Sequence, residues 1–165
     1  MKKSIHKPRY IYQKQAYFPY QCGPFAIYNL LIKHHKYYDL TRLIKLCKAT
    51  VLHGTLCKNM DMALTKINGI CDIYIKSVEP TFTAICTTIK QNGSIILLFH
   101  WKDANSVEGD HYVMIESFEN NKFKIINYSF DDEIKFVSSR ILKTMLFSHK
   151  NEEFNEVYPK AWGII

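Results

Sequence analysis

One of the five cysteines stands where a nucleophile would be activated. Cys22 comes directly before Gly23-Pro24, and the apolar residues that follow recur at helical spacing. Cys22 therefore lies at a predicted helix start, where free backbone N–H groups and the positive end of the helix dipole favour a thiolate over a thiol. The position indicates nucleophilic chemistry at Cys22, and a small buried core residue is the alternative interpretation.

The other four cysteines lie in poorer settings for a nucleophile. Cys47 and Cys86 fall on apolar stripes of predicted helices, where core packing explains them. Cys57 is near a helix start, and Cys71 belongs to a strand-like run. Because the number of cysteines is odd and no C-x-x-C pair occurs, we expect reduced thiols and a cytoplasmic, intracellular protein.

A cysteine nucleophile needs a base, and the base needs a group that orients it. His111 begins a predicted apolar strand after a polar loop, at the rim of a sheet, which would leave one ring nitrogen free. Asn127 ends the strand that a hairpin folds back beside it, where an amide can accept the ring N–H and fix the tautomer. Asp131 and Asp132 are rival orienting groups, and a structural histidine beside a turn asparagine is the alternative interpretation.

A thioester mechanism also needs hydrogen-bond donors for the oxyanion that forms on attack. The backbone N–H of Cys22 is one candidate. A side-chain amide upstream is the second, and Gln13, Gln15 and Gln21 are available.

The elements that must position these residues fall into two halves of the chain. Helical periodicity dominates the first half, and β-branched and aromatic runs bounded by turn residues dominate the second. Helices are expected from Gly23, after Asp39, from about residue 56, after Thr81 and after Ser138, and strands at 70–77, 94–100, 111–118 and 122–128. This segregation predicts an α+β fold with an antiparallel sheet, and 165 residues fit one domain spanning 1–165.

Composition and charge argue against several other classes of protein. The 22 basic and 15 acidic residues give a formal net charge of +7, spread along the chain, which indicates a solvated surface, with an anionic partner as the second interpretation. No basic-aromatic block matches an RNA-binding signature, so no nucleic-acid partner is predicted. No signal peptide or apolar run long enough for a bilayer occurs, so no membrane insertion is expected. His53 and Cys57 have the spacing of a metal-ligand pair, but without a second such pair we predict no metal.

Several sequence blocks, taken in order, resemble the papain-like cysteine peptidases, specifically the bacteriocin-processing (C39-type) group. The resemblance covers roughly residues 10–147 and combines a Cys-Gly-Pro block with a His-Tyr-Val block. It rests on Gln21-Cys22-Gly23-Pro24-Phe25-Ala26, His53-Gly54-Thr55, Met60-Asp61-Met62-Ala63-Leu64, Gly93-Ser94-Ile95-Ile96-Leu97-Leu98, Gly109-Asp110-His111-Tyr112-Val113-Met114-Ile115 and Lys122-Phe123-Lys124-Ile125-Ile126-Asn127.

The resemblance implies a papain-like fold, with an N-terminal helical half packed on a C-terminal antiparallel sheet and the active site in the cleft between them. It implies Cys22 as nucleophile, His111 as general base and then acid, and Asn127 as the orienting residue. It also implies an oxyanion glutamine, for which Gln15 is the first candidate and Gln21 the second. No cofactor is implied.

Asn127-Tyr128 stands here where the family usually has Asp-Pro, and the usual position of the oxyanion glutamine falls on Ala16, one residue from Gln15. The expected function is that of a thiol protease or amidase that hydrolyses a peptide or protein substrate. The alternatives are a deamidase or acyltransferase with the same triad, or a catalytically inactive domain that binds a partner through its lysines. The sequence predicts no oligomeric state.

Overall fold

The computed structural model describes residues 9–12, 19–102, 108–129 and 132–164. A short 3-10 turn, η2 (Pro19–Gln21), leads into the first helix. The helices are α1 (Cys22–Lys33), α2 (Leu40–Leu46), α3 (Cys57–Cys71), α4 (Phe82–Lys90) and α5 (Ser139–Met145). The strands are β1 (Ile75–Val78), β2 (Ile95–Lys102), β3 (Glu108–Glu119), β4 (Lys122–Ile126), β5 (Ile134–Ser138), β6 (His149–Asn151), β7 (Glu156–Tyr158) and β8 (Lys160–Ile164).

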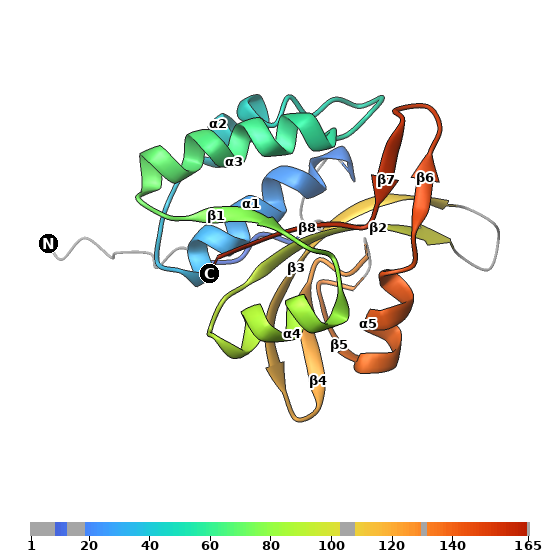
Figure 1. The fold of residues 1–165 in the computed structure, drawn as a ribbon. Helices are drawn as coiled ribbons and strands as arrows, with labels where there is room; N and C mark the ends of the chain where they lie inside the picture. The colour runs from blue at the N-terminus through green and yellow to red at the C-terminus, as the bar shows by residue number, and fades with distance from the viewer. Residues whose placement is uncertain (1–8, 13–18, 103–107, 130–131, 165) are drawn as a thin grey trace, which may run out of the picture.

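An antiparallel six-stranded sheet, in the order β1-β8-β2-β3-β4-β5, forms the middle layer of the molecule. Helices α1, α2 and α3 lie on one face of this sheet, and α4 and α5 lie on the other (Figure 1). Strands β6 and β7 form a separate hairpin (the C-terminal hairpin) at one end of the molecule. The α+β class with helices packed on an antiparallel sheet is confirmed.

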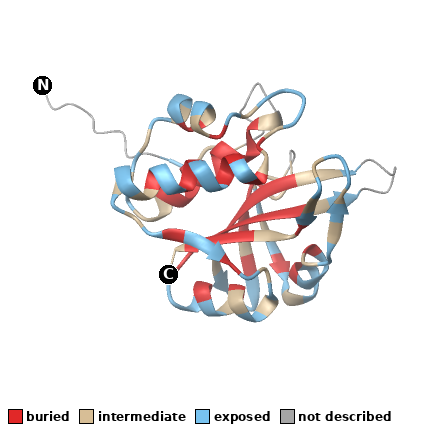
Figure 2. Cartoon of the chain, turned by 45° about the horizontal axis from the view of Figure 1, so that its top comes forward, coloured by how far each residue is buried: buried red, intermediate tan, exposed pale blue. Residues whose placement is uncertain are grey.

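Alternation along the strands explains why both faces carry helices. In β2, Ile96 and Leu98 join the core under α1 to α3, while Leu97 and Phe99 join the core over α4 and α5. Because consecutive residues of a strand point to opposite faces, an unbroken apolar run such as this one is buried on both sides. Figure 2 shows buried residues on the helices and through the middle strands of the sheet, with exposed residues on the outer sides of the helices.

Local polar residues determine where three of the helices begin. The side chains of Asp39, Thr81 and Ser138 each accept a hydrogen bond from the backbone N–H three residues further on, at the starts of α2, α4 and α5. These three caps were predicted and are confirmed. The structure also places strands that the sequence pattern does not predict, namely β5, β6, β7 and β8, and β3 begins at Glu108 instead of His111.

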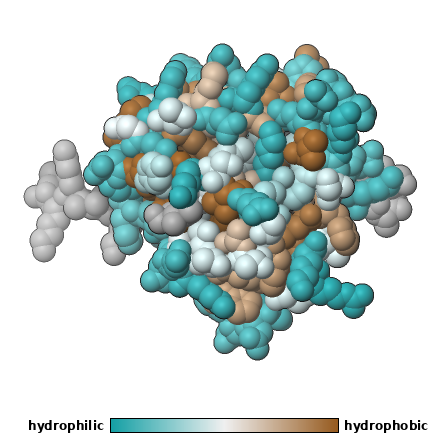
Figure 3. Space-filling model, in the orientation of Figure 1, coloured by the Kyte–Doolittle hydropathy of each residue, from teal (hydrophilic) through white to brown (hydrophobic). Residues whose placement is uncertain are grey.

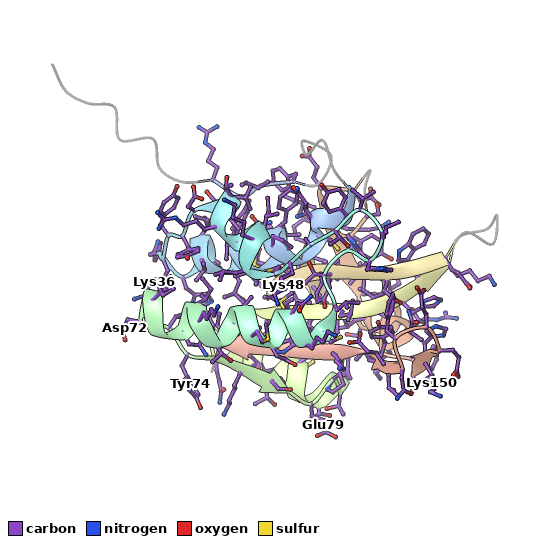
Figure 4. All side chains as sticks on the ribbon, turned by 90° about the horizontal axis from the view of Figure 1, so that it is seen from above. Lys36, Lys48, Asp72, Tyr74, Glu79 and Lys150 are labelled. Atoms are coloured by element: carbon purple, nitrogen blue, oxygen red, sulfur yellow. The ribbon has the colours of Figure 1, made fainter. Side chains whose placement is uncertain are left out.

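The outer surface is mainly hydrophilic, with hydrophobic side chains in small separate groups on the face that Figure 3 shows. Lys36, Lys48 and Lys150, labelled in Figure 4, lie in well-separated parts of the molecule, and the acidic Asp72 lies near Lys36. The separation of these lysines agrees with a positive charge that is spread over the surface. No helix in the described part of the chain combines the length and apolar character needed to cross a membrane.

Candidate active site

The start of α1 and the first half of β3 meet at a cavity of about 940 Å³. Cys22 from α1 and His111 from β3 both line it. The loop before α3 contributes residues 51–54, and the turn of the C-terminal hairpin contributes Glu153 and Phe154. Figure 1 shows the start of α1 directed toward this hairpin. The first two residues of the predicted triad therefore reach one cavity from elements far apart in the sequence.

Close packing determines the position of Cys22 at the helix start. Cys22 is the first residue of α1 and is 7% exposed. A Cβ on the next residue, Gly23, would lie 2.7 Å from Oγ1 of the buried Thr55. Only glycine lets Thr55 pack this closely, and Pro24 is tolerated because the backbone N–H groups of a first helical turn have no partner within the helix.

The position of Cys22 at a helix start favours the thiolate, but the surroundings of the side chain favour the thiol. Burial raises the pKa of Cys22, and the charge of Asp110 acts in the same direction. The backbone N–H groups of Tyr112, Gly23 and Cys22 itself act to lower this pKa, but the net shift is upward. The resting group is therefore a thiol, in contrast to the expectation from the sequence.

The protonation of the His111 ring follows from its hydrogen bond. His111 is 7% exposed, and its Nε2 lies 2.7 Å from the backbone oxygen of Asn127. A carbonyl oxygen only accepts, so Nε2 carries the proton and Nδ1 is left as the basic nitrogen. Burial lowers the pKa of His111, while the Asn127 carbonyl acts to raise it. The ring is thus a neutral base with a defined tautomer.

Asn127 contacts His111 through its main chain, whereas the sequence leads us to expect its side-chain amide. The residue directly follows β4 with a φ of 57°, a left-handed conformation that asparagine adopts more readily than most residues. Its N–H donates to the oxygen of Glu133 at 2.7 Å, and its side-chain Nδ2 donates to the oxygen of Ile11 at 3.1 Å. The rival Asp132 is paired with Lys135 at 2.8 Å, and Asp131 lies outside the described residues.

No hydrogen bond joins the Cys22 thiol to the His111 ring among the residues that the structure describes. The two groups share the cavity as a neutral thiol and a neutral imidazole. Such a pair can react when the thiol proton moves to Nδ1 as the sulfur attacks a carbonyl carbon.

Of the groups expected to donate to an oxyanion, only the backbone N–H of Cys22 and the side chain of Gln21 belong to described residues. Cys22 begins α1, so its backbone N–H belongs to the first turn, whose N–H groups have no partner within the helix. Tyr20 and Cys22 line the cavity, but Gln21 between them is not among its described lining residues, and it makes no side-chain cap hydrogen bond. Gln13 and Gln15 lie outside the described residues.

A polar cluster beside His111 was not predicted. Asp110 accepts from Nδ2 of Asn151 at 2.9 Å and lies 3.0 Å from Nδ1 of His100, whose ring stacks on His149 at 3.7 Å. The cluster attaches the C-terminal hairpin to the ends of β2 and β3. Its only signal in the sequence is the hairpin register, which sets His100 opposite Asp110.

His53, considered above as a metal ligand beside Cys57, instead contacts the ring of Phe154 at 5.3 Å and the carboxylate of Glu153 at 4.0 Å. Within the described ranges, no group of three or more His, Cys, Asp or Glu side chains is arranged to hold a metal ion.

No protein-family model and no curated protein matches this chain. Among solved structures, it is similar to the peptidase domain of Streptococcus ComA, a bi-functional ABC transporter involved in a quorum-sensing pathway. The two share 15% sequence identity with a TM-score of 0.60, over 86% of this chain and 88% of that domain. The chain therefore has an α+β, papain-like fold.

Proposed function

We propose that this chain is a cysteine peptidase or amidase of the bacteriocin-processing (C39-type) kind, acting as a single domain of residues 1–165. Cys22 is the nucleophile, His111 the general base and acid, and Asn127 the orienting residue. One observation carries the proposal: Cys22 and His111 line the same cavity, and the His111 ring is held with Nδ1 as its basic nitrogen. The likeness to a peptidase domain adds to it.

The reaction proceeds in two halves. The Cys22 sulfur attacks the carbonyl carbon of the substrate while its proton passes to Nδ1 of His111, and the carbonyl oxygen becomes an oxyanion facing the backbone N–H of Cys22. The C–N bond then breaks, and His111 gives the proton to the leaving amine. In the second half, water loses a proton to His111 and attacks the thioester carbon, which releases the acid and restores the thiol.

The second oxyanion donor is proposed to be the side-chain amide of Gln15, with Gln21 as the other candidate. This route needs no metal or cofactor, because the attacking, proton-transferring and orienting groups all belong to the chain.

The cavity has the size and the apolar lining to take a segment of a peptide. Its volume of about 940 Å³ lies at the upper end of the range usual for small-molecule sites. Exposed Leu52 and Trp101 at its border offer apolar contacts for side chains, and Phe154 lines it as well. We therefore propose peptides or protein segments as substrates.

Incubation with a proteome-derived peptide library, read by mass spectrometry, tests the proposal. The wild type and a Cys86→Ala variant, altered at a cysteine of α4 on the other face of the sheet, should produce the same new peptide termini. Cys22→Ala should produce none. Cleavage that persists in Cys22→Ala overturns the proposal. Conversion of amide side chains to acids without chain cleavage would instead identify a deamidase, and acyl groups transferred to amines would identify an acyltransferase.

A further inference from the structure

A continuous chain of hydrogen bonds leads from the helix of Cys22 to the ring of His111. It begins at Asn29, in the middle of α1, whose side chain is 0% exposed. A buried amide must find partners for both its oxygen and its nitrogen. Asn29 finds both on one residue: its Oδ1 accepts from the N–H of Ile11 at 2.8 Å, and its Nδ2 donates to the oxygen of Ile11 at 2.8 Å.

Ile11 extends this chain of hydrogen bonds to Asn127. Its oxygen accepts a second hydrogen bond, from Nδ2 of Asn127 at 3.1 Å. The backbone oxygen of Asn127 in turn accepts from Nε2 of His111 at 2.7 Å. Residues 10 and 11 (the N-terminal strap) thus connect the helix that carries Cys22 with the group that holds the His111 ring.

A second contact fixes the strap to the sheet. The hydroxyl of Tyr10 donates to Oε1 of Glu116 at 2.7 Å, and Glu116 also pairs with Lys124 at 2.7 Å and with Lys33 at 3.7 Å. These partners come from β3, β4 and α1. The strap is therefore held at two neighbouring residues, and the oxygen of Ile11 has little freedom to follow Asn127 if Asn127 shifts.

We propose that Asn29 is a positioning residue for His111, acting through Ile11 and Asn127, and that the N-terminal strap sets where the imidazole stands relative to Cys22. This inference rests on the proposed function for its catalytic meaning. The hydrogen-bond chain itself is testable without turnover.

The chain offers a closely matched control. Asn68 of α3 holds Ile75 with the same pair of bonds, accepting from its N–H at 2.9 Å and donating to its oxygen at 2.7 Å. These two hydrogen bonds hold the edge strand β1 against α3. Neither Asn68 nor Ile75 is among the described residues that line the cavity. Asn68→Ala removes two hydrogen bonds of the same kind as those lost in Asn29→Ala, but it leaves the chain of hydrogen bonds to His111 intact.

The experiment follows the Nε2–H of His111 in imidazole ¹H–¹⁵N spectra and measures its rate of exchange with water, together with thermal unfolding. Asn29→Ala should speed this exchange about five- to tenfold, since it frees the strap from α1. Asn127→Gly keeps the carbonyl and permits the positive φ but loses the amide, so it should have a similar effect. The double variant should exceed neither single variant, because both break one chain. Asn68→Ala should lower the melting temperature and leave the exchange unchanged.

Exchange that stays at the wild-type rate in both Asn29→Ala and Asn127→Gly overturns the inference. The inference is also overturned if Asn68→Ala speeds the exchange of the His111 Nε2–H as much as Asn29→Ala does. It is overturned as well if the effects of Asn29→Ala and Asn127→Gly add in the double variant. Either result indicates a general loosening of the fold. If Asn29→Ala does not fold, Asn127→Gly still breaks the chain from its other end. If the spectra behave as expected but the wild type cleaves no peptide, the proposed function is wrong and the inference about the hydrogen-bond chain still holds. Where a cleaved peptide is found, Asn29→Ala should lower kcat with little change in KM.

Discussion

The protonation states of Cys22 and His111 decide how the candidate site would operate. Burial moves the pKa of the thiol upward and that of the imidazole downward, so each group is held in its neutral form. A buried ion pair would have needed compensating hydrogen bonds on both charges. The structure instead supplies one strong hydrogen bond, from Nε2 of His111 to a main-chain oxygen, which fixes the tautomer without creating a charge.

The acid limb of peptide cleavage should lie below the ordinary pKa of a histidine, about 6.5. Because burial lowers the pKa of His111, the ring stays available as a base at a pH where an exposed histidine is already protonated. The pH dependence of kcat/KM on a peptide found by the library experiment measures this. An acid limb at or above the ordinary value would contradict the neutral-base description.

Alkylation of Cys22 by iodoacetamide should accelerate toward alkaline pH and show no plateau at acidic pH. The thiolate is the reactive form, and burial raises the pKa of this thiol. Site-resolved mass spectrometry after brief labelling between pH 5 and 10 gives the profile, with the less buried Cys86 as an internal reference. Rapid labelling of Cys22 at acidic pH would reveal a thiolate–imidazolium pair instead.

At the scale of elements, the start of α1 depends on its contact with the loop before α3. The side chain of Thr55 occupies the space that a Cβ on Gly23 would need. Helices α2, α4 and α5 begin at polar caps, but Gln21 at the start of α1 makes no side-chain cap bond, so packing against Thr55 fixes where this helix begins. This contact holds Gly23, the residue next to Cys22.

Gly23→Ala should therefore destabilise the fold by about 1–3 kcal/mol and reduce cleavage, because either Thr55 or the helix start must move. Gly69 of α3 is the matched control: it is also helical, and a Cβ there meets nothing within 4 Å. Gly69→Ala should stabilise by about 0.4–1 kcal/mol by restricting the unfolded chain. Urea unfolding of both variants measures the difference, and equal effects at the two sites would rule out the close-packing explanation.

The sequence predicts those elements whose causes are local. Asp39, Thr81 and Ser138 cap helices because a side-chain oxygen reaches an N–H three residues away, an interaction that needs nothing from the rest of the chain. The hairpin after His111 was predictable in the same way, since its turn residues and alternation lie together. These local signals bring His111 and Asn127 onto neighbouring segments.

Features that depend on distant partners could not be predicted. Strand β8 is five residues long and is stabilised by pairing with both β1 and β2, neither of which is near it in sequence. The role of the Asn127 main chain depends on a positive φ, which the residue type permits but does not require. The cluster around Asp110 needs the C-terminal hairpin, whose short strands carry little periodicity.

At the scale of the whole molecule, the titrating groups affect stability as well as chemistry. Burial lowers the pKa of both His111 and the half-buried His34, whose Nε2 lies 3.1 Å from Oγ of Ser94. Above about pH 6.5 these rings are neutral in the folded and the unfolded chain alike. Below it the unfolded chain takes up protons that the folded chain does not, so the free energy of unfolding falls until the folded-state pKa values are passed.

The fold should consequently lose stability between pH 7 and pH 5, above the range in which its carboxylates protonate. Glu116 affects stability at a lower pH. Burial raises its pKa, but the contacts with Lys124 and Tyr10 outweigh this effect and bring the pKa below its ordinary value of 4.5. Urea unfolding of the wild type and of His34→Gln/His111→Gln across this range tests the assignment. The double variant should show the shallower loss, and parallel curves would assign the loss to other groups.

The position of β8 also affects how the chain is made. β1 and β2 are both complete long before β8, which follows β1 by about 80 residues and is the partner that joins them. While a ribosome extends the chain from its N-terminus, β2 to β5 can already assemble, but one edge of β2 stays open to other strands. The strand that joins β1 to β2 is thus translated after both of them, and until it emerges one edge of β2 can pair wrongly with a neighbouring chain.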